Sequence, residues 1–231
     1  IDIFDADNVF IKNQLYSSFH VIGQQLFSGR ICVAQAALEF RKRLFDNTIM
    51  YAQSKSCWTN NGARKLFSLP HINNIISQNE LNFNICNAYV QHCESKLACF
   101  LRTKRIPGKD LSHDIAIAKI KCVEDSIHFV NLLQNEIGSY ALMDSSGFGQ
   151  RDFLTCCKFA EGDTRILMQQ IAKNQLKKYS KNVLSNNREI NNLCFKILDT
   201  NINNQLLIYD LANLIINERV NHKKIYHESK L

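Results

Sequence analysis

Two carboxylates beside a glycine are the residues of this sequence best suited to chemistry. Glu161 and Asp163 flank Gly162 directly before a run of helical periodicity. A carboxylate shielded from water has a raised pKa and can act as a general base. Gly162 would let the backbone approach a bound molecule closely, and Asp163 would be stable at a helix start. From these residues alone, an ordinary acidic helix start is the simpler interpretation.

The cysteines indicate neither a disulfide framework nor a metal site. The chain has 9 cysteines, an odd number, and they are scattered without a C-x-x-C pair. This usage is typical of a reducing compartment. Adjacent Cys156 and Cys157 could form a redox pair, but cysteines with apolar neighbours are more often inert buried thiols.

The charge pattern argues against a nucleic-acid partner. The formal net charge is +7, but the basic residues are dispersed, and the densest cluster lies in a single stretch at 102–109. No basic arm or interleaved aromatic motif accompanies this cluster. Mild basicity fits equally well with a ligand that carries phosphates. No stretch is apolar enough to predict a membrane span or a signal peptide.

Long helices must position these residues. The chain of 231 residues has only 8 glycines and 2 prolines, which disfavours a many-stranded sheet protein. Ser112 with Asp114 is predicted to cap one helix, a polar break is expected at 59–62, and 139–160 reads as a loop or broken helix. Apolar residues at three- and four-residue steps predict helices over 17–54, 72–101, 115–137, 161–178 and 188–217, the last with an interruption near 201–204.

The predicted fold is all-α, an up-and-down helical bundle with a short extended segment at its amino terminus. Residues 1–16 alternate apolar and polar side chains and read as a strand end and linker, the edge of a sheet domain not included in the sequence. Residues 17–231 form the helical bundle domain. Because the chain begins at Ile1 rather than Met, we expect a processed or incomplete polypeptide.

Three segments, in order, resemble the carboxyl-terminal helical domain of the acyl-CoA dehydrogenase and oxidase family. The first comprises residues 28–38 with 51–55, the second runs from 115–119 to 133–138, and the third is 159–173. Together they cover nearly the whole chain to about Tyr179. The third segment, with its aromatic-Glu-Gly sequence, is the most informative.

The resemblance implies a role for each matching residue. Glu161 would be the catalytic base that removes the α-proton of an acyl thioester, and Arg30 and Gly162 would bind the substrate. Some branches of the family carry the base on the first helix instead, at the position that Gly29 occupies here. Lys55 and Asn135 stand where the family has arginine and glutamine. The residues implied to lie near the cofactor FAD are Lys55, Trp58, Asn135, Gly138, Asp163 and Thr164.

The implied activity is the flavin-dependent oxidation of acyl-CoA to trans-2-enoyl-CoA in fatty acid β-oxidation. The family's other two domains, which hold most of the flavin, are not in these residues. The expected partners are therefore acyl-CoA and the rest of the oxidase polypeptide, or a partner subunit that carries the flavin domains. A homodimer or larger assembly is expected. The alternative is a non-catalytic helical subunit derived from the family, with a structural or assembly role.

Two short signals favour an oxidase and a peroxisome. The sequence Glu161-Gly162-Asp163 is closer to the oxidases than to the Glu-Gly-Thr of dehydrogenases. The chain ends in Ser229-Lys230-Leu231, the tripeptide read by the peroxisomal import receptor. A mitochondrial or cytoplasmic location is the alternative.

Overall fold

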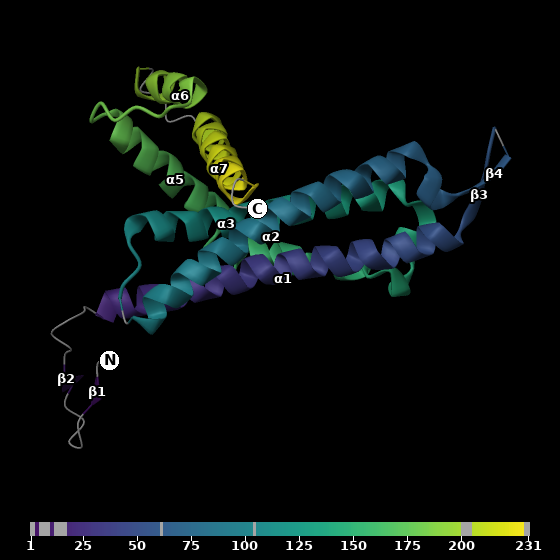
Figure 1. Ribbon diagram of the computed structural model, residues 1–231, viewed down its shortest axis with the longest axis horizontal. Coiled ribbons are helices and arrows are strands. Elements are labelled where there is room, and N and C mark those ends of the chain that lie inside the picture. The colour runs from purple at the N-terminus through teal and green to yellow at the C-terminus, as the bar shows by residue number, and fades with distance from the viewer. Residues whose placement is uncertain are drawn as a thin grey trace.

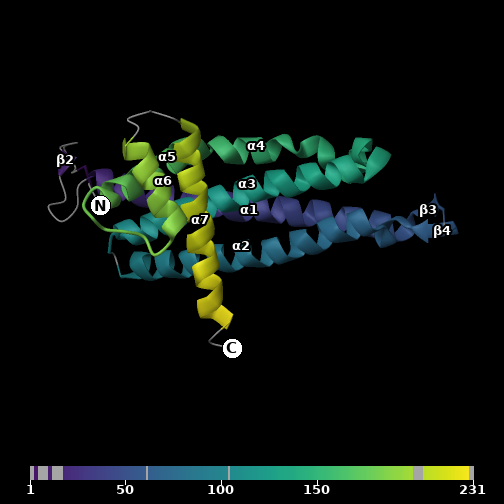
Figure 2. The ribbon, with the colours of Figure 1, turned by 90° about the horizontal axis from the view of Figure 1, so that it is seen from above.

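Three long helices lie side by side and form the body of the molecule (Figures 1 and 2). The computed structural model describes residues 3–4, 10–11, 18–60, 62–103, 105–199 and 205–228. The predicted up-and-down arrangement is confirmed by α1 (Ser18–Ser54), α2 (Pro70–Arg102) and α3 (Lys109–Glu136), which follow one another along the chain. Pro70 opens α2 at a position where its missing N–H costs nothing.

Helix α3 is the central element of the bundle. It packs against both α1 and α2, and its apolar residues are buried on most sides. Ala34 and Ala37 of α1 have no exposed surface, and small side chains of this kind allow helices to approach closely. The fold therefore surrounds the middle of α3 with protein, including the side chain of Lys119.

The predicted polar break after α1 is in fact a hairpin. Strands β3 (Ser56–Thr59) and β4 (Gly62–Lys65) pair antiparallel, with Trp58 opposite Ala63. The hairpin projects from one end of the bundle (Figure 1). A 3-10 turn, η1 (Leu66–Ser68), then leads into α2.

The segment predicted as a loop or broken helix contains several short helical pieces. Phe148 and Leu154, each 1% exposed, anchor it to the core. Three of the pieces are 3-10 turns, and the fourth is an α-helix that runs back along the bundle (Figure 2). They are η2 (Gly138–Leu142), η3 (Asp144–Ser146), η4 (Phe148–Gln150) and α4 (Asp152–Phe159).

The carboxyl-terminal helices are α5 (Thr164–Tyr179), α6 (Arg188–Asp199) and α7 (Gln205–Glu228). The predicted interruption near 201–204 lies outside the described residues, between the end of α6 and the start of α7. Helix α7 crosses the bundle at a steep angle (Figure 2). Arg219 ties it to the body, since Nε of Arg219 lies 2.8 Å from Oδ1 of Asp114.

The predicted cap of α3 is wrong. Gly108 is the N-cap residue, and Ser112 donates to the carbonyl of Gly108 from within the helix. Asp114 lies six residues beyond Gly108, inside the helix, where it is buried and accepts hydrogen bonds from Tyr89 and Arg219. Its carboxylate therefore links three helices and does not start one.

The extended amino-terminal segment is described in part. Strands β1 (Ile3–Phe4) and β2 (Phe10–Ile11) pair antiparallel. Ser229, Lys230 and Leu231 lie outside the described residues. No helix in the described part of the chain is long and apolar enough to cross a membrane.

Candidate functional site

Glu161 lies in a tight turn between two helices. Helix α4 ends at Phe159 and α5 begins at Thr164, so the predicted helix start at Glu161 is three residues too early. The backbone is left-handed at two consecutive residues, with φ of 55° at Glu161 and 106° at Gly162. Glycine adopts this conformation freely, but a glutamate does so only where its surroundings hold it.

Charged side chains hold both sides of this turn. Nε of Arg30 donates to the backbone carbonyl of Glu161 at 3.0 Å. Asp163 is the N-cap residue of α5, and its Oδ1 accepts from the backbone N–H groups of Arg165 at 2.7 Å and Ile166 at 3.3 Å. The expectation that Asp163 stands at a helix start is confirmed. Its carboxylate is occupied by capping, a contact that stabilises a helix by about 1 kcal/mol.

The Glu161 carboxylate lies directly against Gly29 of α1. A Cβ atom placed on Gly29 would be 2.4 Å from Cδ of Glu161, and 2.6 and 2.7 Å from its two carboxylate oxygens. No side chain can therefore occupy position 29 while Glu161 keeps this conformation. Positions 29 and 161, which carry the base in different branches of the resembled family, thus direct their side chains into the same space in this chain.

Lys119 completes the turn from inside the bundle. It has no exposed surface, and its Nζ donates to the carbonyls of Lys158 at 2.6 Å and Gly162 at 2.9 Å and to Oγ1 of Thr164 at 3.1 Å. Burial lowers the pKa of Lys119 to about 8, although Asp163 and Glu124 favour the charged form. Sequence reasoning missed this residue. The available signal was a lysine between Ala118 and Ile120, inside the largely apolar run that begins at Ile115.

Thr164 does not have the surroundings that its implied role requires. The resemblance assigns it to the flavin, but it has no exposed surface. Its hydroxyl accepts from Lys119 and donates to the carbonyl of Lys158 at 3.1 Å. A residue without accessible surface cannot contact a cofactor. The implied flavin contact of Thr164 is therefore wrong, and its side chain holds the turn instead.

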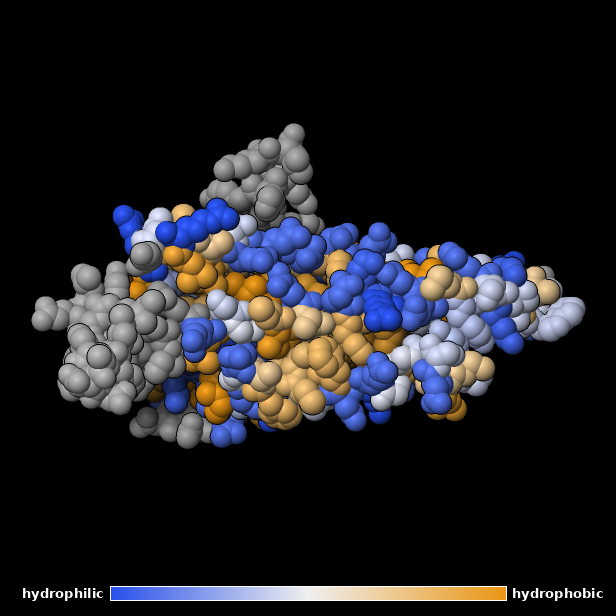
Figure 3. All heavy atoms as spheres, turned by 90° about the horizontal axis from the view of Figure 1, so that it is seen from below, coloured by the Kyte–Doolittle hydropathy of each residue, from blue (hydrophilic) through white to orange (hydrophobic). Residues whose placement is uncertain are grey.

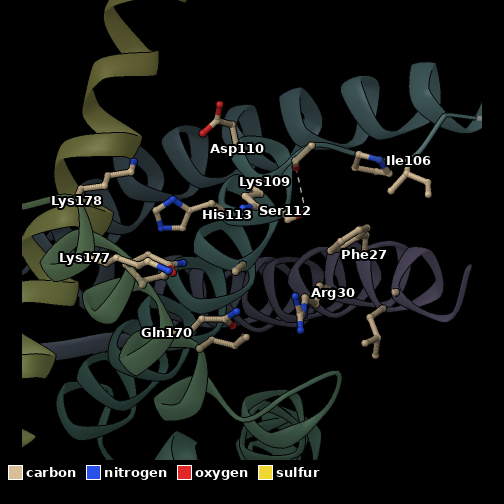
Figure 4. A pocket seen from close by; sticks show the side chains of 18 of the residues that line it. Phe27, Arg30, Ile106, Lys109, Asp110, Ser112, His113, Gln170, Lys177 and Lys178 are labelled. Carbon is tan, nitrogen blue, oxygen red and sulfur yellow. Dashed lines mark hydrogen bonds between the residues drawn. The ribbon is translucent and has the colours of Figure 1, made fainter. Parts of the chain in front are cut away.

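A cavity of about 920 Å³ opens beside the turn. Arg30 lies in its wall and connects it to Glu161 (Figure 4). The wall has the apolar side chains of Phe27 and Ile106 on one side, whereas Lys177 and Lys178 lie on the other. Such a wall fits a ligand with an apolar portion and an anionic portion.

The charges at this cavity favour anions. Lys109, Lys177 and Lys178 line it, and α3 begins there with a glycine N-cap and no side-chain cap. Free N–H groups at a helix start attract anionic groups. Burial is the main cause that lowers the pKa of His113, and the positive charge of Arg219 lowers it further. This imidazole is therefore neutral at pH 7, and the positive charge of the cavity comes from the lysines.

The remaining predicted residues gather at the opposite end of the bundle. Trp58, on the hairpin, is 86% exposed, and Lys55 is exposed beside it. Asn135 and Gly138 are exposed at the end of α3. Stacking of Tyr51 on Tyr140, with ring centroids 4.0 Å apart, joins these two segments. The candidate residues thus form two groups, one at each end of the molecule (Figures 1 and 2).

An apolar surface lies on the face opposite α7. Figure 3 shows apolar side chains gathered over the middle of this face. Phe153 and Phe159 of α4 are 43% and 59% exposed, and Phe153 packs against Phe40 of α1. Apolar patches of this kind commonly mark interaction surfaces.

Comparison with known proteins identifies the fold. No protein-family model and no curated protein sequence matches this chain. Three solved structures resemble it: butyryl-CoA dehydrogenase from Megasphaera elsdenii (TM-score 0.56, 17% identity) and acyl-CoA dehydrogenases from Mycobacterium smegmatis (0.58, 19%) and Slackia heliotrinireducens (0.57, 14%). They cover 71%, 78% and 76% of this chain, whereas this chain spans only 39%, 42% and 44% of theirs. The resemblance inferred from the sequence is thereby confirmed at the level of the fold: the chain has the fold of the carboxyl-terminal helical domain of acyl-CoA dehydrogenases.

Proposed function

We propose that this chain is the carboxyl-terminal part of a flavin-dependent acyl-CoA oxidase or dehydrogenase, and that Glu161 removes the α-proton of the acyl thioester. The observation that carries the proposal is the position of Glu161: its carboxylate rests on Gly29, and its backbone carbonyl is bound by Arg30, which lines a cavity of about 920 Å³. The fold shared with acyl-CoA dehydrogenases supports it.

The cavity suits the coenzyme A part of an acyl-CoA. Its phosphates would lie near Lys177 and Lys178 and the free N–H groups at the start of α3. The thioester would lie near Arg30, with its α-carbon within reach of Glu161. Binding there would displace water from the carboxylate, and a carboxylate that has lost its hydration is a stronger base.

The residues at the opposite end fit a flavin nucleotide. The exposed ring of Trp58 offers a stacking surface, and Lys55 offers a point charge for a phosphate. Asn135 adds an exposed amide, and Gly138 leaves the backbone accessible. A flavin supplies the hydride acceptor that completes oxidation to the trans-2-enoyl thioester. Because these residues lie far from Glu161, we expect them to serve the active site of a second copy, in a homodimer or larger assembly.

The rest of the catalyst belongs to another part of the polypeptide or to a partner subunit. The chain spans 39% to 44% of the acyl-CoA dehydrogenase structures that it resembles. The exposed apolar face with Phe153 and Phe159 is a suitable surface for that remainder. Packing there would cover side chains that now face water.

An oxidase in a peroxisome is the more specific form of the proposal. It is supported by Glu161-Gly162-Asp163 and by the terminal Ser229-Lys230-Leu231. An oxidase releases one hydrogen peroxide for each enoyl-CoA formed in air, whereas a dehydrogenase needs a separate electron acceptor. Measuring peroxide with the native assembly distinguishes the two. Deleting the terminal tripeptide should move a fluorescent fusion out of the peroxisomes.

Glu161→Gln is the central test. The variant keeps the size and polarity of the side chain but cannot accept the α-proton. In the native assembly we expect turnover of acyl-CoA to fall by at least about 10²-fold, while substrate affinity changes by less than about twofold. The exposed Glu80→Gln on α2 is the matched control and should have full turnover. Normal turnover in Glu161→Gln would remove Glu161 as the base.

The alternative is a non-catalytic helical subunit of the same descent. It is favoured by Lys55 and Asn135, which replace the arginine and glutamine of the resembled family. This alternative predicts an assembly without flavin. Mass spectrometry of cofactors released from the purified native assembly separates the two functions, since FAD in a one-to-one ratio supports the enzyme and its absence supports the structural subunit.

A further inference from the structure

One buried ammonium group binds the end of α4, the turn around Glu161 and the start of α5. Nζ of Lys119 donates to the carbonyl of Lys158 at 2.6 Å, the carbonyl of Gly162 at 2.9 Å and the hydroxyl of Thr164 at 3.1 Å. The first acceptor belongs to the last turn of α4, the second to the turn itself, and the third to the first residue of α5. Lys119 comes from a third helix, α3, and has no exposed surface.

The number of donors matches the number of acceptors. An ammonium group carries three N–H donors and a neutral amine only two. The carbonyls at the end of α4 have no partner within their own helix, and a cation at a helix carboxyl terminus is favourable. The charged form of Lys119 is therefore the form that holds all three groups.

Two cations also hold two consecutive carbonyls of the strained turn. Arg30 binds the carbonyl of Glu161, and Lys119 binds the carbonyl of Gly162. Glu161 has a φ of 55°, a conformation that costs a non-glycine residue on the order of 1 kcal/mol or more. Such a turn persists only if its neighbours fix it, and these two side chains do so from opposite helices.

We propose that Lys119 is a positioning residue for Glu161: by binding Lys158, Gly162 and Thr164, it fixes the turn that holds the Glu161 carboxylate against Gly29. The catalytic consequence rests on the proposed function, whereas the effect on the turn does not. The charged groups around the ammonium are Arg30 of α1, Glu124 of α3 and Asp163 before α5, with the thiol of Cys157 in α4. The two carboxylates favour the charged form of Lys119, and burial lowers its pKa to about 8.

Lys119→Met in the full chain tests the effect on the turn. Methionine fills the space without donors. We expect the amides of 160–166 to exchange hydrogen at least about tenfold faster, while those in the middle of α2 do not change. Lys121→Met is the matched control, because Lys121 lies two residues along α3 and pairs with Asp125 instead. Unchanged exchange at 160–166 in Lys119→Met overturns the inference.

Thr164→Val provides a second variant, which removes one acceptor of Lys119 together with the hydrogen bond that the hydroxyl donates to Lys158. We expect exchange at 160–166 to rise about threefold. If Lys119→Met does not fold, Thr164→Val decides the question, and unchanged exchange there overturns the inference.

Kinetics in the native assembly then connect the turn to the reaction. Lys119→Met should lower kcat by at least about tenfold and leave KM for acyl-CoA within about twofold, because the substrate contacts remain. Faster exchange with normal kcat would keep Lys119 as the support of the turn but would contradict Glu161 as the base. Failure of the inference and failure of the proposed function are thus distinguishable.

Discussion

The two ends of the bundle hold their candidate residues in different ways. At one end, the backbone around Glu161 is bound by Arg30, Lys119 and the capping carboxylate of Asp163. At the other end, Lys55 and Trp58 face water. The first group is held in place by contacts within this chain, whereas the second group is an exposed surface that can bind another chain. Changes at the first end should therefore alter the chain itself, and changes at the second should alter only what it binds.

The largest effect on the free energy of unfolding is expected at the ion pair that joins α7 to the body of the bundle. Arg219 neutralises Asp114, whose side chain is 4% exposed. We expect Arg219→Met to lower the free energy of unfolding by about 2–4 kcal/mol, because a buried carboxylate loses its charged partner. Urea unfolding measures this loss. Lys42→Met is the control, since Lys42 and Asp46 are 51% and 53% exposed and should contribute less than about 0.5 kcal/mol. Equal losses in the two variants would contradict the expectation that the partly buried ion pair contributes more to stability than the exposed one.

The buried ammonium predicts a pH dependence of stability. Burial lowers the pKa of Lys119 from 10.5 to about 8, so between these values the unfolded chain binds a proton that the folded chain does not. The free energy of unfolding should therefore rise as the pH increases from about 8 to 10.5, and should not depend on this group below pH 8. Relative to Lys119→Met, the expected gain is on the order of 1–3 kcal/mol, measured by urea unfolding across that range. A constant difference between the two proteins would exclude the lowered pKa.

A methyl group at position 29 should separate activity from stability. In Gly29→Ala the new Cβ would overlap the Glu161 carboxylate, which can swing away at little cost because it is the end of a flexible side chain. We expect turnover in the native assembly to fall about tenfold, with the free energy of unfolding changed by less than about 1 kcal/mol. Gly149→Ala, at an exposed glycine outside the cavity with no atom within 4 Å, is the control and should keep full turnover.

The smallest effect on the chain is expected at the hairpin. Trp58 is 86% exposed, so Trp58→Ala should change the free energy of unfolding by less than about 0.5 kcal/mol. In the native assembly the same change should reduce the amount of bound flavin, measured by absorbance after release. A large loss of stability would show that the hairpin end is organised within the chain after all, and would remove the contrast between the two ends.

Helical periodicity predicted the long helices because their apolar stripes coincide with the core. Leu38 and Phe45 of α1 are both nearly fully buried, as their spacing indicated. The shorter elements were not predicted, and the reason is physical. Helix α4 has only two turns, too few for a period to be recognised. Strand β3 alternates exposed and half-buried residues and β4 is exposed at three of its four residues, so neither strand has a strong apolar signal.

The candidate site was predictable only where its signal was local. Glu161 and Gly162 stand in a recognisable motif, and the cap formed by Asp163 depends on its two nearest helical residues. Lys119 lies 39 to 45 residues from the groups that it binds, so no spacing could reveal it. A lysine in an apolar run would ordinarily be expected to reach the solvent. Its role follows only from the packing of α3 against α4 and α5.

The contact between Gly29 and Glu161 also constrains how this chain can vary. A carboxylate at one of these positions requires the absence of a side chain at the other, because both would occupy one space. A single substitution at position 29 would displace the carboxylate from this place, and a single loss at 161 would leave the place empty. Where the reaction needs a carboxylate there, the two positions should change together, and related active sequences should show them as a covarying pair.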